Sequence, residues 1–162
     1  MVCLGNICRS PLAEGILKSK LKNTGIQVDS AGTASYHQGE NPDYRAISIA
    51  KKHNIDISGH IARQFKTSDF DSYDIIYVMD ENNYNDLLRL SGKSDNLSKV
   101  ELITGALHPG MKIPVPDPYY GGYEDFEKTF KVLNENCELI AVNLIRDYKI
   151  NPRNSIFKKK HE

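Results

Sequence analysis

The chain has 162 residues, of which 40% are hydrophobic and 26% are charged, and this composition is ordinary for a globular domain. Lysine plus arginine and aspartate plus glutamate each number 21, so no overall charge exists to attract nucleic acid or anionic membranes. Three cysteines do not make a disulfide framework, and no apolar run reaches the roughly 18 residues of a membrane helix. We therefore expect a cytoplasmic protein without a signal peptide, with one domain over residues 1–150 and a polar, basic tail over residues 151–162.

The stretch from Cys3 to Pro11 is the first candidate site, because a cysteine and an arginine flank five residues and a Ser-Pro pair follows. A loop of this length can turn successive backbone N–H groups toward one oxyanion, and the next helix adds its positive dipole end. Cys3 then lies beneath the anion, where such surroundings lower a cysteine pKa from about 8.5 to about 3.5–7.5. Arg9 can bind two anion oxygens with its planar guanidinium. The stretch therefore predicts a phosphate loop with a thiolate at its floor.

Gly5 and Asn6 favour this interpretation, because both residue types tolerate the left-handed backbone that a loop around an anion needs. Three alternatives remain open for the loop alone. Cys3 can be a buried structural cysteine at the end of a strand, or it can form a reversible disulfide with Cys8. A metal site is the weakest alternative, since no third ligand lies at a matching spacing.

After the loop, the chain alternates helical and extended patterns. Residues 10–21 have the apolar periodicity of a helix, which a Ser-Pro pair can open. Residues 26–29 alternate apolar and polar side chains and predict a short strand, followed by a loop of small residues over 30–42. Tyr36 and His37 stand out in this loop, and they are either ordinary exposed residues on a connection or a wall for a flat substrate.

The middle of the chain repeats the alternation. Residues 43–54 predict a helix, and residues 73–79 form a nearly continuous apolar run, typical of a parallel strand buried on both faces. His60, between them, is either structural or a polar residue that orients the phosphate loop without touching the substrate. Asp80 follows the apolar run. It either caps a helix over residues 81–90 or lies near the phosphate loop, because ligands collect beyond the carboxyl ends of parallel strands.

The last third adds a strand over residues 100–103 and a loop over residues 104–123 that is rich in proline and glycine. That loop holds Asp117 between two prolines, with two tyrosines after it. A long amphipathic helix follows and carries Cys137 on its apolar face, so we expect Cys137 in the core. The alternation predicts an α/β fold, a three-layer sandwich with a four-stranded, mostly parallel sheet whose first strand is truncated at the N-terminus.

Hydrolysis through a phosphocysteine needs a nucleophile, a clamp for the phosphate oxygens, and an acid that protonates the leaving oxygen. Cys3, Arg9 and Asp117 can supply one of each. The loop residues expected to surround the phosphate are Leu4, Gly5, Asn6, Ile7, Cys8 and Ser10.

Several motifs spread over nearly the whole chain support this combination. They are Val2 to Pro11, Asp29-Ser30-Ala31-Gly32-Thr33, Pro42-Asp43-Tyr44-Arg45, His60-Ile61-Ala62-Arg63-Gln64, Met79-Asp80-Glu81 and Asp117-Pro118-Tyr119-Tyr120-Gly121. In these motifs and in their order the chain resembles the low-molecular-weight protein tyrosine phosphatases. The set of motifs is highly specific, whereas the first loop alone is not.

The resemblance implies that Cys3 is the nucleophile, Arg9 the phosphate clamp and Asp117 the general acid. Further implied roles concern support and substrate binding. Ser10 donates to the Cys3 thiolate, Asn6 and His60 brace the loop, Tyr36 and Tyr119 form aromatic walls, and Cys8 can form a protective disulfide with Cys3. We also expect Asp80 to support the site and Tyr120 to contribute to substrate binding. Tyr119 and Tyr120 also match positions that kinases phosphorylate in some relatives.

The implied substrates are phosphotyrosine proteins or small aryl phosphates, with inorganic phosphate or vanadate as inhibitors. We expect no metal or organic cofactor, no nucleic-acid or membrane partner, and a monomer.

Three other functions compete with this one. Arsenate reductases share a similar loop but use further downstream cysteines, and here none lies between Cys8 and Cys137. Protein-arginine phosphatases place threonine where this chain has Ile7. A non-catalytic phosphopeptide binder needs neither Cys3 nor Asp117.

One departure from the family pattern concerns the first strand. The family has several apolar residues before the position of Cys3, whereas here only Met1 and Val2 precede it. An extended residue spans about 3.3 Å, so two residues cannot cross a sheet. We expect either residues upstream of Met1 or a fold with a weakened central strand.

Overall fold

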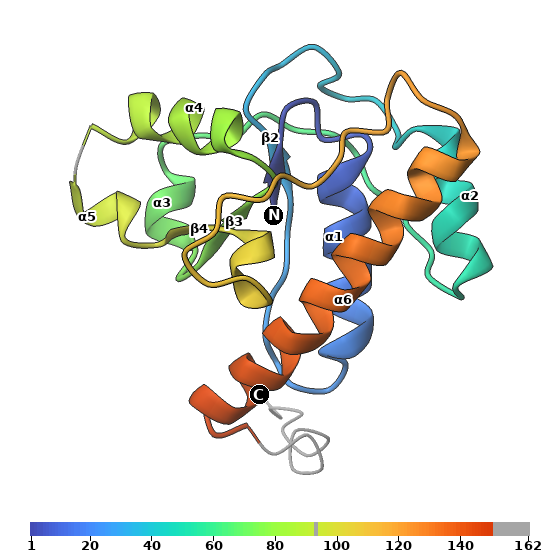
Figure 1. The fold of residues 1–162 in the computed structure, drawn as a ribbon. Coiled ribbons are helices and arrows are strands. Elements are labelled where there is room, and N and C mark those ends of the chain that lie inside the picture. Colours follow the sequence, from blue (N-terminus) through green and yellow to red (C-terminus); the bar gives the residue numbers. More distant parts are fainter. Residues whose placement is uncertain (93, 151–162) are drawn as a thin grey trace, which may run out of the picture.

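A four-stranded parallel sheet forms the middle layer of the computed structural model, which describes residues 1–92 and 94–150 (Figure 1). Its strands are β1 (Val2–Cys3), β2 (Ala31–Gly32), β3 (Ile76–Val78) and β4 (Val100–Leu102). The order across the sheet is β2-β1-β3-β4, and β1 pairs in parallel with both of its neighbours. The carboxyl ends of all four strands therefore lie at one edge, as the predicted α/β sandwich requires.

Helices cover both faces of the sheet (Figure 1). One side carries α1 (Arg9–Lys20), α2 (Tyr44–Lys52) and α6 (Tyr123–Asp147), and the other carries α3 (Asp69–Ser72), α4 (Glu81–Ser91) and α5 (Ser94–Leu97). A 3₁₀ turn, η1 (Ile103–Ala106), follows β4. Leu12, Ile16 and Leu133 belong to the apolar cluster on the first side, and Phe70 and Val78 to the cluster on the second. The three predicted layers are thus confirmed, each face having its own core.

The predicted helices start and end close to where the sequence patterns place them. Proline lies in the first turn of α1, and Asp43 caps α2 by accepting a hydrogen bond from the Arg45 backbone N–H. Cys137 is fully buried in the first cluster, as predicted for a residue on the apolar face of α6. The predicted loop over residues 104–123 contains one regular element, η1, before α6 begins at Tyr123.

The strand predicted over residues 26–29 is wrong, because β2 lies at Ala31–Gly32 instead. A strand is defined by its partner, and β1 pairs Val2 with Ala31 and Cys3 with Gly32. The alternation of residues 26–29 is real, but these residues lie beyond the paired part of β1. The predicted short first strand is confirmed, since β1 contains two residues.

Across residues 1–92 and 94–150, no helix is both long enough and apolar enough to cross a membrane. The predicted basic tail over residues 151–162 lies outside the described residues.

Candidate active site

The loop between β1 and α1 encloses the Cys3 thiol. The Asn6 backbone N–H lies 3.3 Å from Cys3 Sγ, and Ser10 Oγ lies 3.1 Å from the same sulfur. Asn6 has a φ of 57°, in the left-handed region, as expected. Gly5 does not share this conformation; a Cβ there would lie 3.0 Å from the His37 ring, so glycine provides space at this position. Two hydrogen-bonding groups therefore face the sulfur.

Asn6 is fully buried and holds the loop through both ends of its side-chain amide. Its Nδ2 donates to Ser10 Oγ at 2.8 Å and to Ser30 Oγ at 2.9 Å. Its Oδ1 accepts from the Arg63 backbone N–H at 3.0 Å and lies 3.1 Å from His60 Nε2. His60 therefore contacts Asn6, which holds the loop, and is not among the residues that line the cavity above it.

Glu14 extends this network from the buried face of α1. Its Oε2 accepts from Ser30 Oγ and lies 3.3 Å from His60 Nδ1. Burial by itself would raise the pKa of Glu14, but hydrogen bonds from His60, Lys18 and Ser30 outweigh it and lower the pKa to about 2. A fixed negative charge thus lies at the far end of the network that braces Asn6.

Arg9 is buried, and its guanidinium bridges two carboxylates. Nη1 donates to Asp80 Oδ2 at 2.7 Å and to the Val115 carbonyl at 3.2 Å, while Nη2 donates to Asp117 Oδ2 at 3.1 Å. Burial opposes the charge of Arg9, but Cys3, Asp80 and Asp117 together raise its pKa. Arg9 is therefore a permanent cation at the loop.

Asp80 fulfils both predicted roles. Its Oδ1 accepts from the Asn83 backbone N–H at 2.8 Å and caps α4, while its Oδ2 holds Arg9. The end of β3 thereby fixes the direction of the guanidinium.

Asp117 lies at the mouth of the site, on the loop between η1 and α6. Its side chain is 47% exposed, and its Oδ1 accepts from the Tyr119 backbone N–H at 3.1 Å. This turn, between two prolines, directs Oδ2 toward Arg9. The carboxyl group is therefore held near the loop and still accessible to water.

Arg45 ties the Asp117 loop to α2. It donates from Nη1 to the Gly121 carbonyl at 2.8 Å and from Nη2 to the Tyr119 carbonyl at 2.9 Å. Its Nε and Nη2 also bind both carboxylate oxygens of Asp43, whose backbone N–H donates to the Ile7 carbonyl at 2.8 Å. The hydrogen bonds from Arg45 lower the pKa of Asp43. One guanidinium thus connects the loop from Cys3 to Arg9 with the loop that holds Asp117.

The convergent residues line a cavity of about 340 Å³ at the carboxyl ends of β1 and β3. Its residues are Cys3, Leu4, Gly5, Ile7, Cys8, Arg9, Tyr36, His37, Asp117, Tyr119 and Tyr120. Tyr36 is 76% exposed and Tyr120 is 97% exposed, so these two rings stand at the rim. The Cys3 thiol thus lies at the floor of the cavity, the Arg9 guanidinium forms a cationic wall, and tyrosine rings surround its mouth.

A family model described as "Low molecular weight phosphotyrosine protein phosphatase" matches residues 1–150. The chain belongs to this family. A chicken protein of the same name is 42% identical over 142 residues, which cover 85% of this chain and 89% of the chicken protein.

Solved phosphatase structures share the fold. The protein tyrosine phosphatase from Entamoeba histolytica, with Hepes in its active site, has a TM-score of 0.83 and 35% identity, covering 91% of this chain and 96% of its own. Wzb from Vibrio vulnificus, in complex with benzylphosphonate, has a TM-score of 0.80 and 29% identity, covering 88% and 94%. The chain is thus a low-molecular-weight protein tyrosine phosphatase in sequence and in fold.

Cys8 lines the same cavity of this phosphatase as Cys3 and is buried. Burial raises the pKa of the Cys8 thiol, and the negative charge of Asp43 raises it further. Cys8 therefore remains a thiol at neutral pH.

Sequence reasoning assigned no role to two residues of this phosphatase site. Glu14 is a charged residue within the apolar face of α1, which is the one sequence signal that marks it. Arg45 was part of a quoted motif, but its contacts with the loop that holds Asp117 depend on two segments far apart in the chain. His37, which the sequence singled out together with Tyr36, lines the cavity.

Proposed function

We propose that this phosphatase hydrolyses phosphotyrosine through a covalent phosphocysteine at Cys3. One observation carries the proposal: a thiol, a buried guanidinium and an accessible carboxyl group converge on one cavity of about 340 Å³. A thiol alone would serve redox chemistry and a guanidinium alone would serve binding, whereas the three groups together supply what phosphoryl transfer needs.

In the first step, the phosphate enters the loop and takes hydrogen bonds from the loop amides and Arg9. The Cys3 thiolate attacks phosphorus and a P–S bond forms. The P–O bond to the tyrosine breaks, its electron pair stays on the phenol oxygen, and protonated Asp117 donates the proton that this oxygen needs. Arg9 stabilises the charge on the phosphoryl oxygens during transfer.

In the second step, a water molecule attacks the phosphocysteine. Asp117, now ionised, accepts a proton from that water, the P–S bond breaks, and the electron pair returns to Cys3. The Asn6 N–H and the Ser10 hydroxyl, which lie within 3.3 Å of Sγ, stabilise the departing thiolate. Inorganic phosphate leaves and the site is restored.

The aromatic mouth supports an aryl phosphate as substrate. Tyr119 packs at 6.0 Å from the His37 ring and at 4.9 Å from the Tyr120 ring, measured between ring centroids. Such rings offer flat apolar surfaces to a phenyl group above the phosphate loop. The benzylphosphonate complex of Vibrio vulnificus Wzb, a phosphonate on an aromatic ring, is consistent with this substrate class.

The test compares phosphotyrosine, phosphoserine and phosphoarginine peptides as substrates of the parent chain and of Cys3→Ser. Phosphotyrosine is expected to turn over fastest, with competitive inhibition by phosphate or vanadate, and Cys3→Ser to abolish turnover while retaining vanadate binding. Cys137→Ser is the matched control, because that cysteine lies in the core, outside the cavity. Near-normal turnover in Cys3→Ser would sink the covalent mechanism, and faster release of phosphate from phosphoarginine would assign a different substrate.

A further inference from the structure

Three exposed tyrosines continue the mouth of the active-site cavity over the first turns of α2 and α6. Tyr44 begins α2 and is 78% exposed, Tyr120 lines the cavity, and Tyr123 begins α6. The two helices pack against each other, and Figure 1 shows the start of α6 beside α2. We call the surface formed by Tyr44, Tyr120 and Tyr123 the shelf.

The Arg45 guanidinium links Tyr44 to Tyr120. It donates hydrogen bonds to the two carbonyl groups on either side of Tyr120, at 2.9 and 2.8 Å. Its central carbon lies 5.8 Å from the centre of the Tyr44 ring and 4.5 Å from the centre of the buried Phe126 ring. A planar guanidinium held by carbonyls and by a buried ring has little freedom to move. The backbone beneath both exposed rings is therefore fixed.

The cations beside the shelf already have carboxylate partners. Arg45 Nη2 lies 2.8 Å from Asp43 Oδ2. Lys52, in the last turn of α2, lies 5.9 Å from the centre of the Tyr123 ring and forms an ion pair with Glu127. Neither cation is free to bind an acidic side chain. What the shelf offers to a ligand is therefore aromatic surface, which favours flat and apolar groups.

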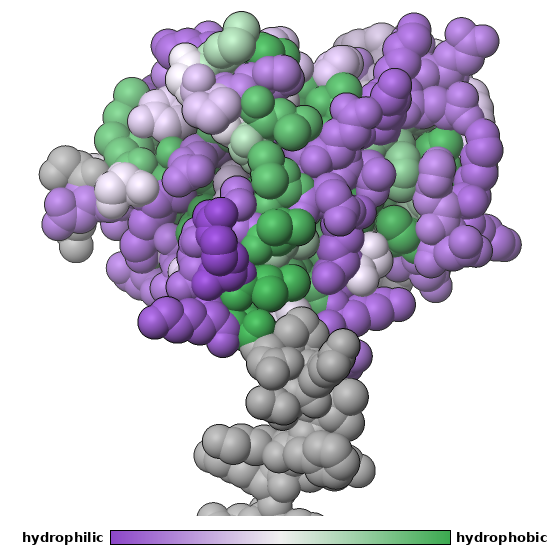
Figure 2. Space-filling view, turned by 60° about the horizontal axis from the view of Figure 1, so that its bottom comes forward, coloured by the Kyte–Doolittle hydropathy of each residue, from purple (hydrophilic) through white to green (hydrophobic). Residues whose placement is uncertain are grey.

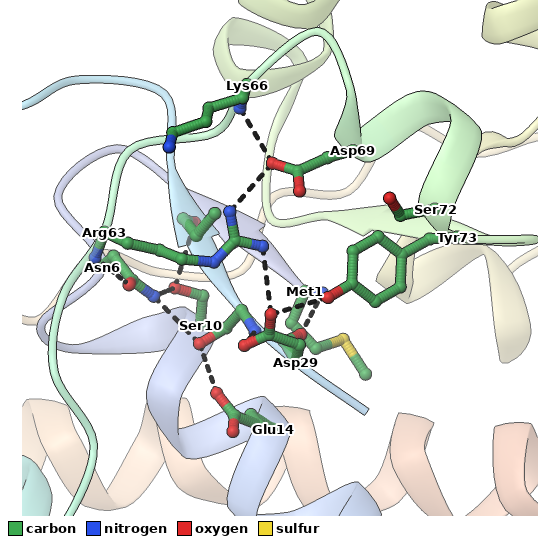
Figure 3. Close-up of polar contacts among 12 residues, drawn as sticks. Met1, Asn6, Ser10, Glu14, Asp29, Arg63, Lys66, Asp69, Ser72 and Tyr73 are labelled. Atoms are coloured by element: carbon green, nitrogen blue, oxygen red, sulfur yellow. Dashed lines mark hydrogen bonds and ion pairs between the residues drawn. The ribbon is translucent and has the colours of Figure 1, made fainter. Parts of the chain in front are cut away.

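The tyrosines of the shelf differ from a tyrosine that supports the fold. The Tyr73 hydroxyl donates to Asp29 Oδ2 at 2.7 Å, beside the Arg63 guanidinium (Figure 3). Within residues 1–92 and 94–150, Tyr73 is the only tyrosine whose hydroxyl makes a hydrogen bond to another residue. The exposed rings of the shelf are therefore not tied to the fold through their hydroxyl groups, and their faces are open to a ligand.

Exposed apolar surface also occurs at the opposite end of the molecule. Figure 2 brings that end forward and shows a band of apolar surface between hydrophilic flanks. Tyr148, which is 56% exposed, follows the last turn of α6 there. Exposure alone therefore does not identify a docking surface. The shelf is distinguished by its continuity with the mouth of the active-site cavity, which it shares through Tyr120.

We propose that the shelf docks the polypeptide chain of the substrate through an apolar or aromatic side chain one to three residues from the phosphotyrosine. This inference rests on the proposed function, which seats the phosphotyrosine in the cavity. An extended chain that leaves the mouth advances about 3.3 Å per residue, so three residues span roughly 10 Å. The Tyr44 ring lies within this reach, because one guanidinium contacts both that ring and the carbonyl group before Tyr120.

The test measures kcat/KM for three substrates. They are free phosphotyrosine, a phosphopeptide with leucine at the three positions on each side of the phosphotyrosine, and the same peptide with serine at those positions. The parent chain is compared with Tyr44→Ala and with Tyr44→Phe, which keeps the ring and removes only the hydroxyl. Tyr148→Ala is the matched control, because it removes an exposed tyrosine at the opposite end of the molecule.

The loss should be confined to the leucine peptide. Tyr44→Ala is expected to lower kcat/KM for that peptide by about three- to tenfold, mainly through KM, because the contact is made equally before and during the reaction. Tyr44→Phe and Tyr148→Ala should match the parent. With free phosphotyrosine, which does not reach Tyr44, kcat/KM should change by less than about twofold in every variant. The parent should prefer the leucine peptide to the serine peptide.

Three results would overturn the docking role of the shelf while leaving the proposed function intact. The first is an equal loss with free phosphotyrosine and with the leucine peptide in Tyr44→Ala, which would mean that Tyr44 supports the site itself. The second is a parent chain that does not distinguish the two peptides, and the third is an equal loss in Tyr148→Ala. Turnover of phosphoarginine without turnover of free phosphotyrosine would instead overturn the proposed function first, and the docking role with it.

Discussion

The two ends of the parallel sheet differ in how the polar groups around β1 are used. At the carboxyl end, Asn6 uses both ends of its amide and Arg9 makes three hydrogen bonds. At the amino end, backbone groups such as those of Gln27 and Ile75 make no backbone bond within the described ranges. The phosphate loop is thus held by side chains from other segments and very little by the length of its own strand. Changes at the amino end should therefore affect stability more than catalysis, whereas changes to the side chains that face the cavity at the carboxyl end should affect catalysis more than stability.

The largest expected effect is a loss of catalysis at the carboxyl end of the sheet without a loss of stability. Asp117→Ala is expected to lower kcat/KM for phenyl phosphate by about 10²–10⁴-fold, because kcat/KM reports the first chemical step, in which the poor leaving group needs a proton. For para-nitrophenyl phosphate the loss should be much smaller, since that leaving group departs as an anion. Steady-state kinetics with both substrates checks this, and equal losses would show that Asp117 is not the acid. The melting temperature should stay close to that of the parent, because the side chain is 47% exposed.

Glu14→Gln removes the negative charge at the far end of the network that braces Asn6. It tests how much this charge contributes to the stability of the carboxyl end of the sheet. The pKa of Glu14 in the folded state is lowered to about 2. The stabilisation of the folded state by its charge is therefore fully present above the pKa of an unfolded-state glutamate, about 4.3. It is lost as the pH falls toward 2, and a shift of about two units corresponds to at most about 3 kcal/mol.

Urea unfolding at pH 7 and pH 3 measures this difference. The variant should be less stable than the parent at pH 7, and the gap should narrow at pH 3. Glu138→Gln is the control, because Glu138 forms an exposed ion pair with Lys20 and should change little at either pH. A gap that is the same at both pH values would show that the charge of Glu14 is not the stabilising feature.

Arg45→Ala is expected to have a smaller effect that is again confined to the carboxyl end. Without the hydrogen bonds from Arg45 to the Tyr119 and Gly121 carbonyls, the loop that holds Asp117 should be able to move. We therefore expect kcat for phenyl phosphate to fall by about tenfold. The rate with para-nitrophenyl phosphate should change less. Arg45→Lys should recover part of the loss, and Arg89→Ala, at an exposed pair with Asp86, serves as the control. An equal fall with both substrates would contradict positioning of the acid.

The smallest expected effect distinguishes Tyr119 from Tyr120 at the aromatic mouth of the cavity. Tyr120 is 97% exposed, so Tyr120→Ala should raise KM for phosphotyrosine by no more than about twofold. Tyr119 is 37% exposed and packs near His37, so Tyr119→Ala should raise KM more. Kinetics with phosphotyrosine and with a small alkyl phosphate would separate these roles. A larger effect at Tyr120 would reverse the assignment of the walls.

Sequence patterns predicted the features that depend on neighbouring residues. The helical periodicity of α1 and α6, the apolar run ending in β3, and the loop from Cys3 to Arg9 are local and were found. The strand at residues 26–29 was misplaced because pairing depends on how far β1 extends, which the alternation of side chains does not contain. The roles of Arg45 and Glu14 were not predicted, because their partners come from distant segments of the chain. Asp117 was found through its proline-flanked loop and the resemblance to the family, while its contact with Arg9 required the structure.

The ion pair between Arg9 and Asp117 makes substrate binding an exchange of partners. A phosphate that enters the loop competes with Asp117 for Nη2, while Nη1 stays tied to Asp80 and to the Val115 carbonyl. In the proposed mechanism, the arriving dianion thus takes the place of one carboxylate, and the guanidinium keeps a negatively charged partner before and after binding. The release of Asp117 from Arg9 is then coupled to substrate binding, so the carboxyl group becomes free to move only when a phosphate occupies the loop.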